Sequence, residues 1–207
     1  MKILNAKICS NGQIFDGEVT VDGERIASVT SKETSSSSDE TIIDAKGMYV
    51  IPGLLDVHFH GCVGYDTCDA SKEAFDKIAE YEGSEGVLAI CPATMTYPED
   101  KLSEIMDIAA DYESPVGADF VGLHLEGPFI NPVYKGMQKE ECCLLPDVTV
   151  MEDLYNTFKN KKLCRHMTIA PERPGADAVL RFCQEHQIQT AVGHSAATFE
   201  EIKKMRA

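Results

Sequence analysis

From Gly47 onward, the sequence alternates short apolar runs with longer segments whose apolar residues recur at helical spacing. This alternation is typical of β/α units wound around a parallel sheet, so the expected fold class is α/β. Strands are predicted at residues 54–59, 87–91, 120–125, 167–170 and 190–192. Four apolar stripes between them predict helices that pack on the sheet: Ala74, Phe75, Ile78 and Ala79; Leu102, Ile105, Met106 and Ala109; Leu154, Tyr155 and Phe158; and Val179, Leu180, Phe182 and Cys183.

The first fifty residues have a different pattern, in which short β-type runs are joined by turns. Strands are predicted at 2–9, 17–21, 25–30 and 41–44, with Asp22-Gly23 as a hairpin turn. The serines at 35–38 and the charged residues around them cannot pack, and they predict an exposed loop. The sequence thus predicts two domains, at residues 1–50 and 51–207.

The chain is acidic, with a formal net charge of −15 at pH 7. Nucleic acids and anionic membranes are bound by clusters of Lys and Arg. Because this chain is strongly acidic, neither is an expected partner. No apolar run approaches the roughly 20 residues that cross a bilayer, and the opening residues lack a signal-peptide core, so we expect a cytoplasmic protein. The eight cysteines form no C-x-x-C and are expected to be reduced thiols, with Cys62 packing beside the site.

Histidines and a carboxylate stand near the carboxyl ends of the predicted strands. Because strand side chains repeat every two residues, His58 and His60 are expected to face the same way from one strand. Glu126 follows the third predicted strand, and His194 follows the fifth. The carboxyl ends of parallel strands meet at one edge of a sheet, so these side chains are expected to converge. Imidazole and carboxylate are ligands for zinc and similar cations, which favours metal-assisted hydrolysis.

The remaining histidines carry less information. His124 lies two residues before Glu126 and is a candidate for orienting that carboxylate. His166 and His186 have no such context, and they are expected at surface or supporting positions.

The predicted strands are too few for a closed (β/α)8 barrel, which has eight strands and typically about 250 residues. Five are predicted in this part of the 207-residue sequence. Thr198 and Glu201 form a capping-box pattern that starts a last helix, and no terminating Gly or Pro follows it. Catalytic zinc usually has three protein ligands, whereas Glu126 and His194 supply two unless His58 and His60 contribute. The sequence therefore predicts either an open sheet or part of a longer protein.

Five phrases run through essentially the whole sequence: Pro52-Gly-Leu-Leu-Asp-Val-His-Phe-His-Gly, His124-Leu-Glu-Gly-Pro-Phe-Ile-Asn-Pro, Lys135-Gly, Thr168-Ile-Ala-Pro-Glu and Val192-Gly-His-Ser-Ala-Ala-Thr. Together they resemble the N-acetylglucosamine-6-phosphate deacetylase family of the amidohydrolase superfamily. The resemblance implies an incomplete TIM-like (β/α)8 metal-dependent hydrolase barrel, with about five of its eight strands. It also implies that residues 1–50 are part of a small β-sandwich domain.

The resemblance further implies an activity, the conversion of N-acetylglucosamine 6-phosphate and water to glucosamine 6-phosphate and acetate. Glu126 and His194 match two ligands of the family's main metal site, and His58 and His60 match the pair that holds a second ion in some members. Zinc is the expected metal, with iron, manganese or cobalt as alternatives, in a homodimer. The third main-site His and the catalytic Asp of the family lie beyond residue 207, so this chain alone is expected to be inactive.

The loop at 134–138 matches one that contacts the sugar, which makes Met137 and Gln138 the candidate substrate-binding residues. Gln138 stands where the family usually has His, and an amide cannot carry a positive charge. Two alternatives remain at this point. One is a metal-binding fragment without catalysis. The other is an amidohydrolase acting on a cyclic amide, although many of those use a carbamylated Lys on the fourth strand, and the run at 166–171 contains none.

Overall fold

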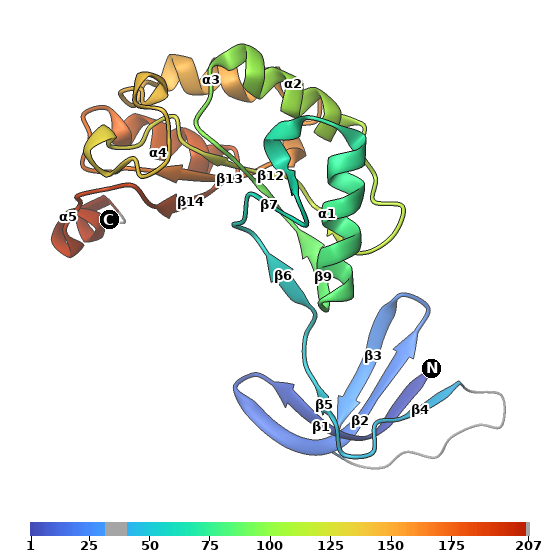
Figure 1. The fold of residues 1–207 in the computed structure, drawn as a ribbon. Helices are drawn as coiled ribbons and strands as arrows, with labels where there is room; N and C mark the ends of the chain where they lie inside the picture. The colour runs from blue at the N-terminus through green and yellow to red at the C-terminus, as the bar shows by residue number, and fades with distance from the viewer. Residues whose placement is uncertain (32–40, 206–207) are drawn as a thin grey trace. The chain divides into compact units, whose positions relative to one another are not determined.

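The computed structural model describes residues 1–31 and 41–205, and the chain divides into two compact units, Met1–Gly53 and Leu54–Ala207 (Figure 1). Each unit has its own core, so we describe each by itself. The polar tract expected to form an exposed loop at 33–40 lies outside the described residues.

The first unit is a five-stranded mixed sheet in the order β3-β2-β1-β4, with β5 also paired to β1. Its strands are β1 (Lys2–Ser10), β2 (Gln13–Asp22), β3 (Arg25–Thr30), β4 (Ile42–Asp44) and β5 (Tyr49–Val50). The hairpin turn falls one residue later than predicted, because Asp22 still pairs with Arg25 and Gly23 adopts a φ of 57°. Ala6, Ile8, Val19 and Ala45 form its small core. The described part of this unit forms one sheet rather than the two of a sandwich.

The second unit contains two rows of parallel strands, β11-β9-β6 and β10-β12-β13-β14, and one antiparallel pair, β7-β8. Its strands are β6 (Leu54–Asp56), β7 (Gly61–Cys62), β8 (Tyr65–Asp66), β9 (Val87–Ile90), β10 (Ala93–Thr94), β11 (Asp119–Phe120), β12 (Leu123–Glu126), β13 (Cys164–Ile169) and β14 (Gln189–Val192). Parallel strands that alternate with helices confirm the α/β class.

The helices of this unit are α1 (Lys72–Ser84), α2 (Glu99–Ala110), α3 (Val148–Thr157), α4 (Ala176–Glu185) and α5 (Phe199–Met205). Short 3-10 turns occur at Thr67–Asp69, Pro132–Tyr134, Glu140–Cys142 and Lys161–Leu163. The stripes predicted for α1 and α2 are buried throughout, and the stripe of α4 is buried except at Leu180, which is partly exposed. Among the described residues, no helix has the length and apolar character needed to cross a membrane.

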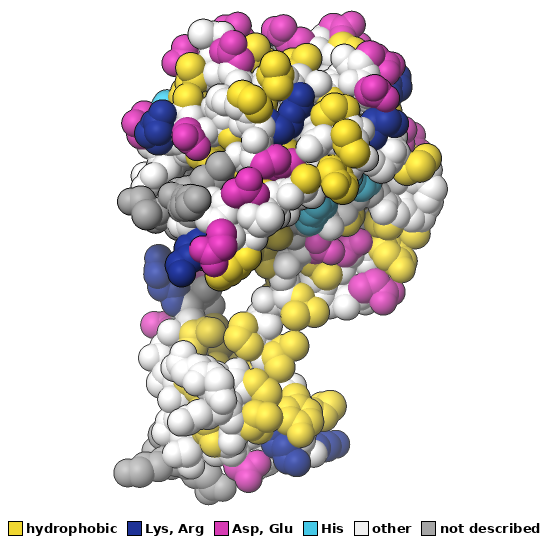
Figure 2. Space-filling model, turned by 90° about the vertical axis from the view of Figure 1, so that its left-hand side faces the viewer, with side chains coloured by type: hydrophobic (Ala, Val, Ile, Leu, Met, Phe, Trp, Pro, Cys, Tyr) yellow, Lys and Arg dark blue, Asp and Glu magenta, His cyan; other side chains and the backbone are white. Residues whose placement is uncertain are grey.

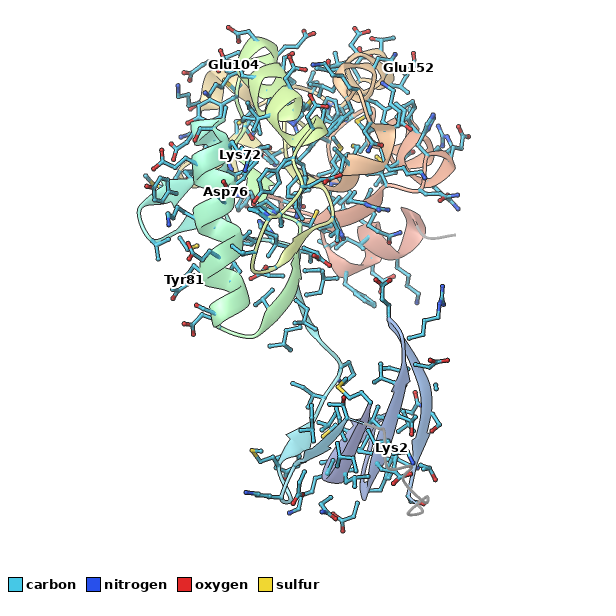
Figure 3. The ribbon with its side chains drawn as sticks, turned by 90° about the vertical axis from the view of Figure 1, so that its right-hand side faces the viewer. Lys2, Lys72, Asp76, Tyr81, Glu104 and Glu152 are labelled. Carbon is cyan, nitrogen blue, oxygen red and sulfur yellow. The ribbon has the colours of Figure 1, made fainter. Side chains whose placement is uncertain are left out.

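The outward face of α1 is polar. Lys72 and Asp76 are one turn apart on it and form an ion pair with an N–O distance of 2.8 Å (Figure 3). The opposite face places Phe75 and Ile78 against the strands. At the other end of the unit, Thr198 donates from its backbone N–H to Glu201 Oε2 (2.7 Å), which confirms the predicted capping box before α5.

The third predicted strand is broken in two. β11 pairs with β9, whereas β12 pairs with β10 and β13, so the chain changes partners between Phe120 and Leu123. Gly122 allows this change because it adopts a φ of 145° against the backbone of Leu163, where a Cβ would clash. Because of this change of partners, Glu126 lies at the carboxyl end of β12, a strand that is buried on both faces.

Candidate metal centre

His58 and His60 do not lie on a strand, which corrects the sequence prediction. β6 ends at Asp56, whose Oδ1 accepts a hydrogen bond from the His58 backbone N–H (3.0 Å) and turns the chain. The two histidines therefore occupy the loop that follows. They still point to one place, because backbone bonds from Ala93 to the Phe59 carbonyl and from Thr67 to the His60 carbonyl hold the loop at the strand ends.

Glu126 is the centre of the group. Its side chain is only 6% exposed, and its carboxylate faces three imidazoles. Oε1 lies 2.8 Å from Nε2 of His58 and 3.3 Å from Nε2 of His194, and Oε2 lies 3.1 Å from Nε2 of His60. These side chains come from the ends of β6, β12 and β14, so the predicted convergence is what the structure shows. Figure 2 shows that some histidine side chains reach the surface, among acidic and apolar ones.

The charges in this group depend on one another. Burial alone would raise the pKa of Glu126, but the hydrogen bond and charge of His60, followed by His194 and His58, outweigh it and lower that pKa to about 2. In return, the hydrogen bond that the protonated His60 ring donates to Glu126 raises the pKa of His60 above its usual value, although burial opposes this. The carboxylate is therefore ionised at neutral pH.

Backbone carbonyls select the tautomer of two of the rings. Nδ1 of His194 lies 2.8 Å from the Tyr134 carbonyl, and Nδ1 of His60 lies 3.3 Å from the Ala93 carbonyl. Because a carbonyl can only accept, each Nδ1 carries the proton and, in the neutral ring, each Nε2 presents a lone pair toward Glu126. Two electron-rich atoms that face each other at 3.1–3.3 Å need a proton or a cation between them.

This donor set fits a divalent cation. The ligand atoms of His58, His60 and Glu126 all lie within 4.8 Å of one another, and His194 adds a third imidazole at the same carboxylate. Two ligands each about 2.1 Å from a tetrahedral zinc lie about 3.4 Å apart, close to the distances from Glu126 to His60 and His194. Imidazole with carboxylate suits zinc and other first-row cations.

His194 has a strained backbone conformation, which the hydrogen bonds of its loop must stabilise. Its φ of 49° is in the left-handed region, which is uncommon for residues other than Gly. Glu172 braces the following turn by accepting from Ser195 Oγ (2.7 Å), from the Ala196 N–H (2.7 Å) and from Asn131 Nδ2 (2.8 Å). Burial raises the pKa of Glu172, but these hydrogen bonds outweigh it, so the pKa lies below its usual value.

His124 does not orient Glu126 by a hydrogen bond, contrary to the prediction. Nδ1 of its ring lies 2.7 Å from the Val57 carbonyl, and Nε2 lies 2.8 Å from Thr168 Oγ1, so both nitrogens are occupied elsewhere. Burial lowers the pKa of His124 to about 4, and the ring is neutral at pH 7. It ties the loop before His58 to β13.

The other residues singled out from the sequence are supporting ones. His166 lies beside His124, with ring centroids 5.5 Å apart, and His186 stacks on Phe182 at 3.9 Å. Cys62 packs with the core under α1, and burial raises the pKa of its thiol to about 11, so it is not a thiolate at neutral pH. All eight cysteines are free thiols in the structure.

The two candidate sugar contacts have different environments. Met137 is 91% exposed, whereas Gln138 is 3% exposed and donates from Nε2 to Glu126 Oε2 (2.6 Å). Sequence reasoning missed Thr96, whose N–H donates to Gln138 Oε1 (2.6 Å) and whose hydroxyl donates to the Glu126 carbonyl (2.7 Å). It also gave no role to Glu172, although Glu172 is part of the Thr168-Ile-Ala-Pro-Glu172 motif, which resembles the family.

Comparison with known proteins gives a consistent set of relatives. No protein-family model matches the chain. An N-acetylglucosamine-6-phosphate deacetylase from Lysinibacillus sphaericus is 30% identical over 164 residues, which is 78% of this chain and 42% of the relative. An N-acetylgalactosamine-6-phosphate deacetylase from Escherichia coli O157:H7 is 29% identical over 73% of this chain and 40% of the relative.

Solved structures agree in fold. The crystal structure of the N-acetyl-D-glucosamine-6-phosphate deacetylase from Mycobacterium smegmatis matches with a TM-score of 0.84, at 22% identity, over all of this chain and 53% of that protein. The chain spans about half the length of the curated relatives it matches. The similarity therefore covers 73–100% of this chain but only 40–53% of each of these proteins.

Proposed function

We propose that this chain, which is similar over most of its length to part of the N-acetylglucosamine-6-phosphate deacetylases, supplies the metal-binding half of a deacetylase for amino sugar 6-phosphates. The single observation that carries the proposal is the Glu126 carboxylate facing Nε2 of His58, His60 and His194 at 2.8–3.3 Å. The reaction would convert N-acetylglucosamine 6-phosphate and water to glucosamine 6-phosphate and acetate. The two-domain division at residues 50 and 51, with a sandwich portion and a barrel portion, belongs to this proposal.

Each residue of the group has a role in the proposal. Glu126 and His194 hold the main ion, and His58 and His60 are positioned for a second ion or for completing the first. When bound, zinc, or iron, manganese or cobalt in its place, polarises the acetamide carbonyl and lowers the pKa of water. The carbonyls of Tyr134 and Ala93 keep His194 and His60 in the tautomer that ligates.

The proton transfers of the reaction need a further group. Acetamide hydrolysis requires a base that takes a proton from water and returns one to the leaving amine. We assign that role to an Asp beyond residue 207, and we place the third histidine ligand of the main metal site beyond residue 207 as well. Residues 1–207 by themselves would then bind metal without turning over substrate.

The loop at 134–138 is the proposed sugar contact. Met137 is exposed, so its side chain is free to lie against a sugar face. Gln138 has one of its two amide N–H groups committed to Glu126, which leaves the other for a hydroxyl or carbonyl of the substrate. We propose that the whole protein acts as a cytoplasmic homodimer, which size-exclusion chromatography with light scattering would test.

Acetate release tests the function directly. The protein that carries this chain is stripped of metal and reloaded with Zn²⁺, and acetate is measured with the 6-phosphates of N-acetylglucosamine and N-acetylgalactosamine. We expect turnover of at least one of them and loss of turnover on stripping. Cyclic amides serve as the comparison substrates. A folded, metal-loaded protein that hydrolyses neither sugar would exclude the proposal, and binding of Zn²⁺ without any turnover would favour a purely metal-binding role.

A further inference from the structure

Gln138 is a buried glutamine to which the proposed function assigns a sugar contact but no role toward the metal. It lies between the Pro132–Tyr134 and Glu140–Cys142 turns, with its backbone N–H donating to the Lys135 carbonyl (3.0 Å) and its own carbonyl accepting from Lys135 Nζ (3.2 Å). Only 3% of the residue is exposed. A polar side chain this deeply buried keeps its place through hydrogen bonds, so its partners reveal its task.

The orientation of the Gln138 amide follows from its two partners. The Thr96 backbone N–H can only donate, so the atom 2.6 Å from it is the amide oxygen. The NH₂ group then faces Glu126 Oε2 at 2.6 Å, which is the favourable arrangement for a carboxylate. An amide nitrogen is not a metal ligand, so in this orientation Gln138 cannot itself hold the ion.

Thr96 closes the arrangement into a ring. Its N–H holds the Gln138 side chain, its hydroxyl donates to the Glu126 carbonyl (2.7 Å), and Gln138 joins the Glu126 carboxylate. Gly127 makes room for this ring, because a Cβ there would collide with Thr96 Oγ1 and the φ of 95° also suits Gly. Both the backbone and the carboxylate of Glu126 are therefore held by neighbouring elements.

The two oxygens of the Glu126 carboxylate have different partners. Oε2 accepts from Gln138 and lies near His60, whereas Oε1 lies near His58 and His194. We propose that Gln138 is a positioning residue that fixes the rotation of the Glu126 carboxylate, so that Oε1 is presented to a cation between His58 and His194. This inference rests on the metal site of the proposed function and not on its substrate.

Metal binding tests the inference without any assay of activity. Gln138→Met keeps the length of the side chain and removes the donor, Gln138→His keeps an N–H donor, and Gln184→Met makes the same change on the exposed face of α4 as a control. Calorimetric titration of the metal-free proteins with Zn²⁺ should give an affinity about 10–100-fold lower for Gln138→Met. Gln138→His should lose less, and Gln184→Met should match the parent protein.

Spectroscopy separates positioning from simple stabilisation. With Co²⁺ in place of Zn²⁺, the visible absorption of the Gln138→Met protein should differ from that of the parent, because the carboxylate is no longer held in one rotation. Equal Zn²⁺ affinity and an identical Co²⁺ spectrum in Gln138→Met would overturn the inference. A parent protein that binds no Zn²⁺ would instead remove the proposed function on which it rests.

A measurement on the unaltered protein covers the case in which Gln138→Met fails to fold. The side-chain amide protons of Gln138 are followed by nuclear magnetic resonance while Zn²⁺ is added. Because one of them bonds to Glu126, we expect its resonance to move in step with metal binding. A resonance that stays in place while the histidine signals move would overturn the inference.

Discussion

A buried carboxylate such as Glu126 is costly unless its charge is matched. Three imidazoles supply the match here and, against the effect of burial, lower the pKa of Glu126 to about 2. The Gln138 amide adds a neutral hydrogen bond. Glu126 thus offers a full negative charge at any pH near neutrality. A cation entering the group has to displace the proton of His60, whose pKa the Glu126 hydrogen bond raises, and not a proton of the carboxylate, so its affinity should fall as pH drops.

His124→Phe is expected to lower the free energy of unfolding by about 1–3 kcal/mol. Phenylalanine fills the space of the ring but leaves the Val57 carbonyl and Thr168 hydroxyl without the partners they have now, and unpaired buried polar groups carry a cost of that size. Urea unfolding followed by circular dichroism measures the change. His186→Phe, on the exposed end of α4, is the matched control and should change stability by less than about 0.5–1 kcal/mol. Equal stability of the two variants would contradict the role given to His124.

At the scale of elements, the turn between β14 and α5 depends on Glu172. Glu172→Gln keeps the size of the side chain but removes the negative charge of the carboxylate that accepts three hydrogen bonds. We therefore expect the free energy of unfolding to fall by about 1–2 kcal/mol. Since this turn carries His194 in a left-handed conformation, Zn²⁺ affinity should fall as well. Urea unfolding and calorimetry on the same samples measure both. A loss of stability with unchanged Zn²⁺ affinity would show that the brace does not position His194.

The same carboxylate makes stability depend on pH. The pKa of Glu172 is lower in the folded protein than in the unfolded chain, so its contribution is present above the unfolded pKa, about 4.3–4.5, and is lost as pH falls through the lower, folded value. Metal-free parent and Glu172→Gln proteins are compared by thermal unfolding between neutral pH and the acid range. The stability difference between them should shrink as the solution becomes acidic. A difference that stays constant would contradict the assignment.

The junction between β11 and β12 depends on Gly122. Alanine there would combine an unfavourable φ of 145° with a Cβ placed 2.6 Å from the Leu163 carbonyl oxygen. Gly86→Ala is a matched control, because Gly86 also has a positive φ of 91° but nothing within 4 Å of its Cβ position. We expect Gly122→Ala to cost at least ~1 kcal/mol more than Gly86→Ala, which costs about 1 kcal/mol. Equal costs in urea unfolding would show that the backbone moves to accept the methyl group.

These elements show what residue patterns can and cannot predict. Apolar runs located β9, β13 and β14, and apolar stripes located the buried faces of the helices, because strands and helices space their apolar residues differently along the chain. The end of β6 at Asp56 and the break at Gly122 were missed, since each depends on one local bond or one close approach to a distant strand. In the site, the ligand types were visible in the sequence. The roles of Thr96 and Glu172 were not, because a backbone N–H donor has no signature and a braced carboxylate looks like any surface one.

At the scale of the whole molecule, exposed apolar side chains lie on the outermost strands of the second unit. Within the described residues, β6 pairs only with β9, and β14 pairs only with β13. Leu54 and Leu55 on β6 are 50% and 57% exposed, and Val192 on β14 is 49% exposed. Unpaired parallel strands with apolar side chains are normally covered by further strands. This favours the proposal that the second unit is one part of a larger barrel.

Metal binding should be visible in the stability of the whole protein. A ligand that binds the folded state alone adds about 2.7 kcal/mol when its concentration is 100 times its Kd, which for a domain of this size raises Tm by roughly 5–10 °C. We expect Zn²⁺ to produce such a shift in the metal-stripped protein and a chelator to reverse it. Glu126→Gln removes the charge at the centre of the group and should abolish the shift while leaving the variant folded without metal. Partly exposed thiols can also bind Zn²⁺, so the same shift in Glu126→Gln would place the responsible site elsewhere in the chain. No shift in the parent protein would contradict the metal centre itself.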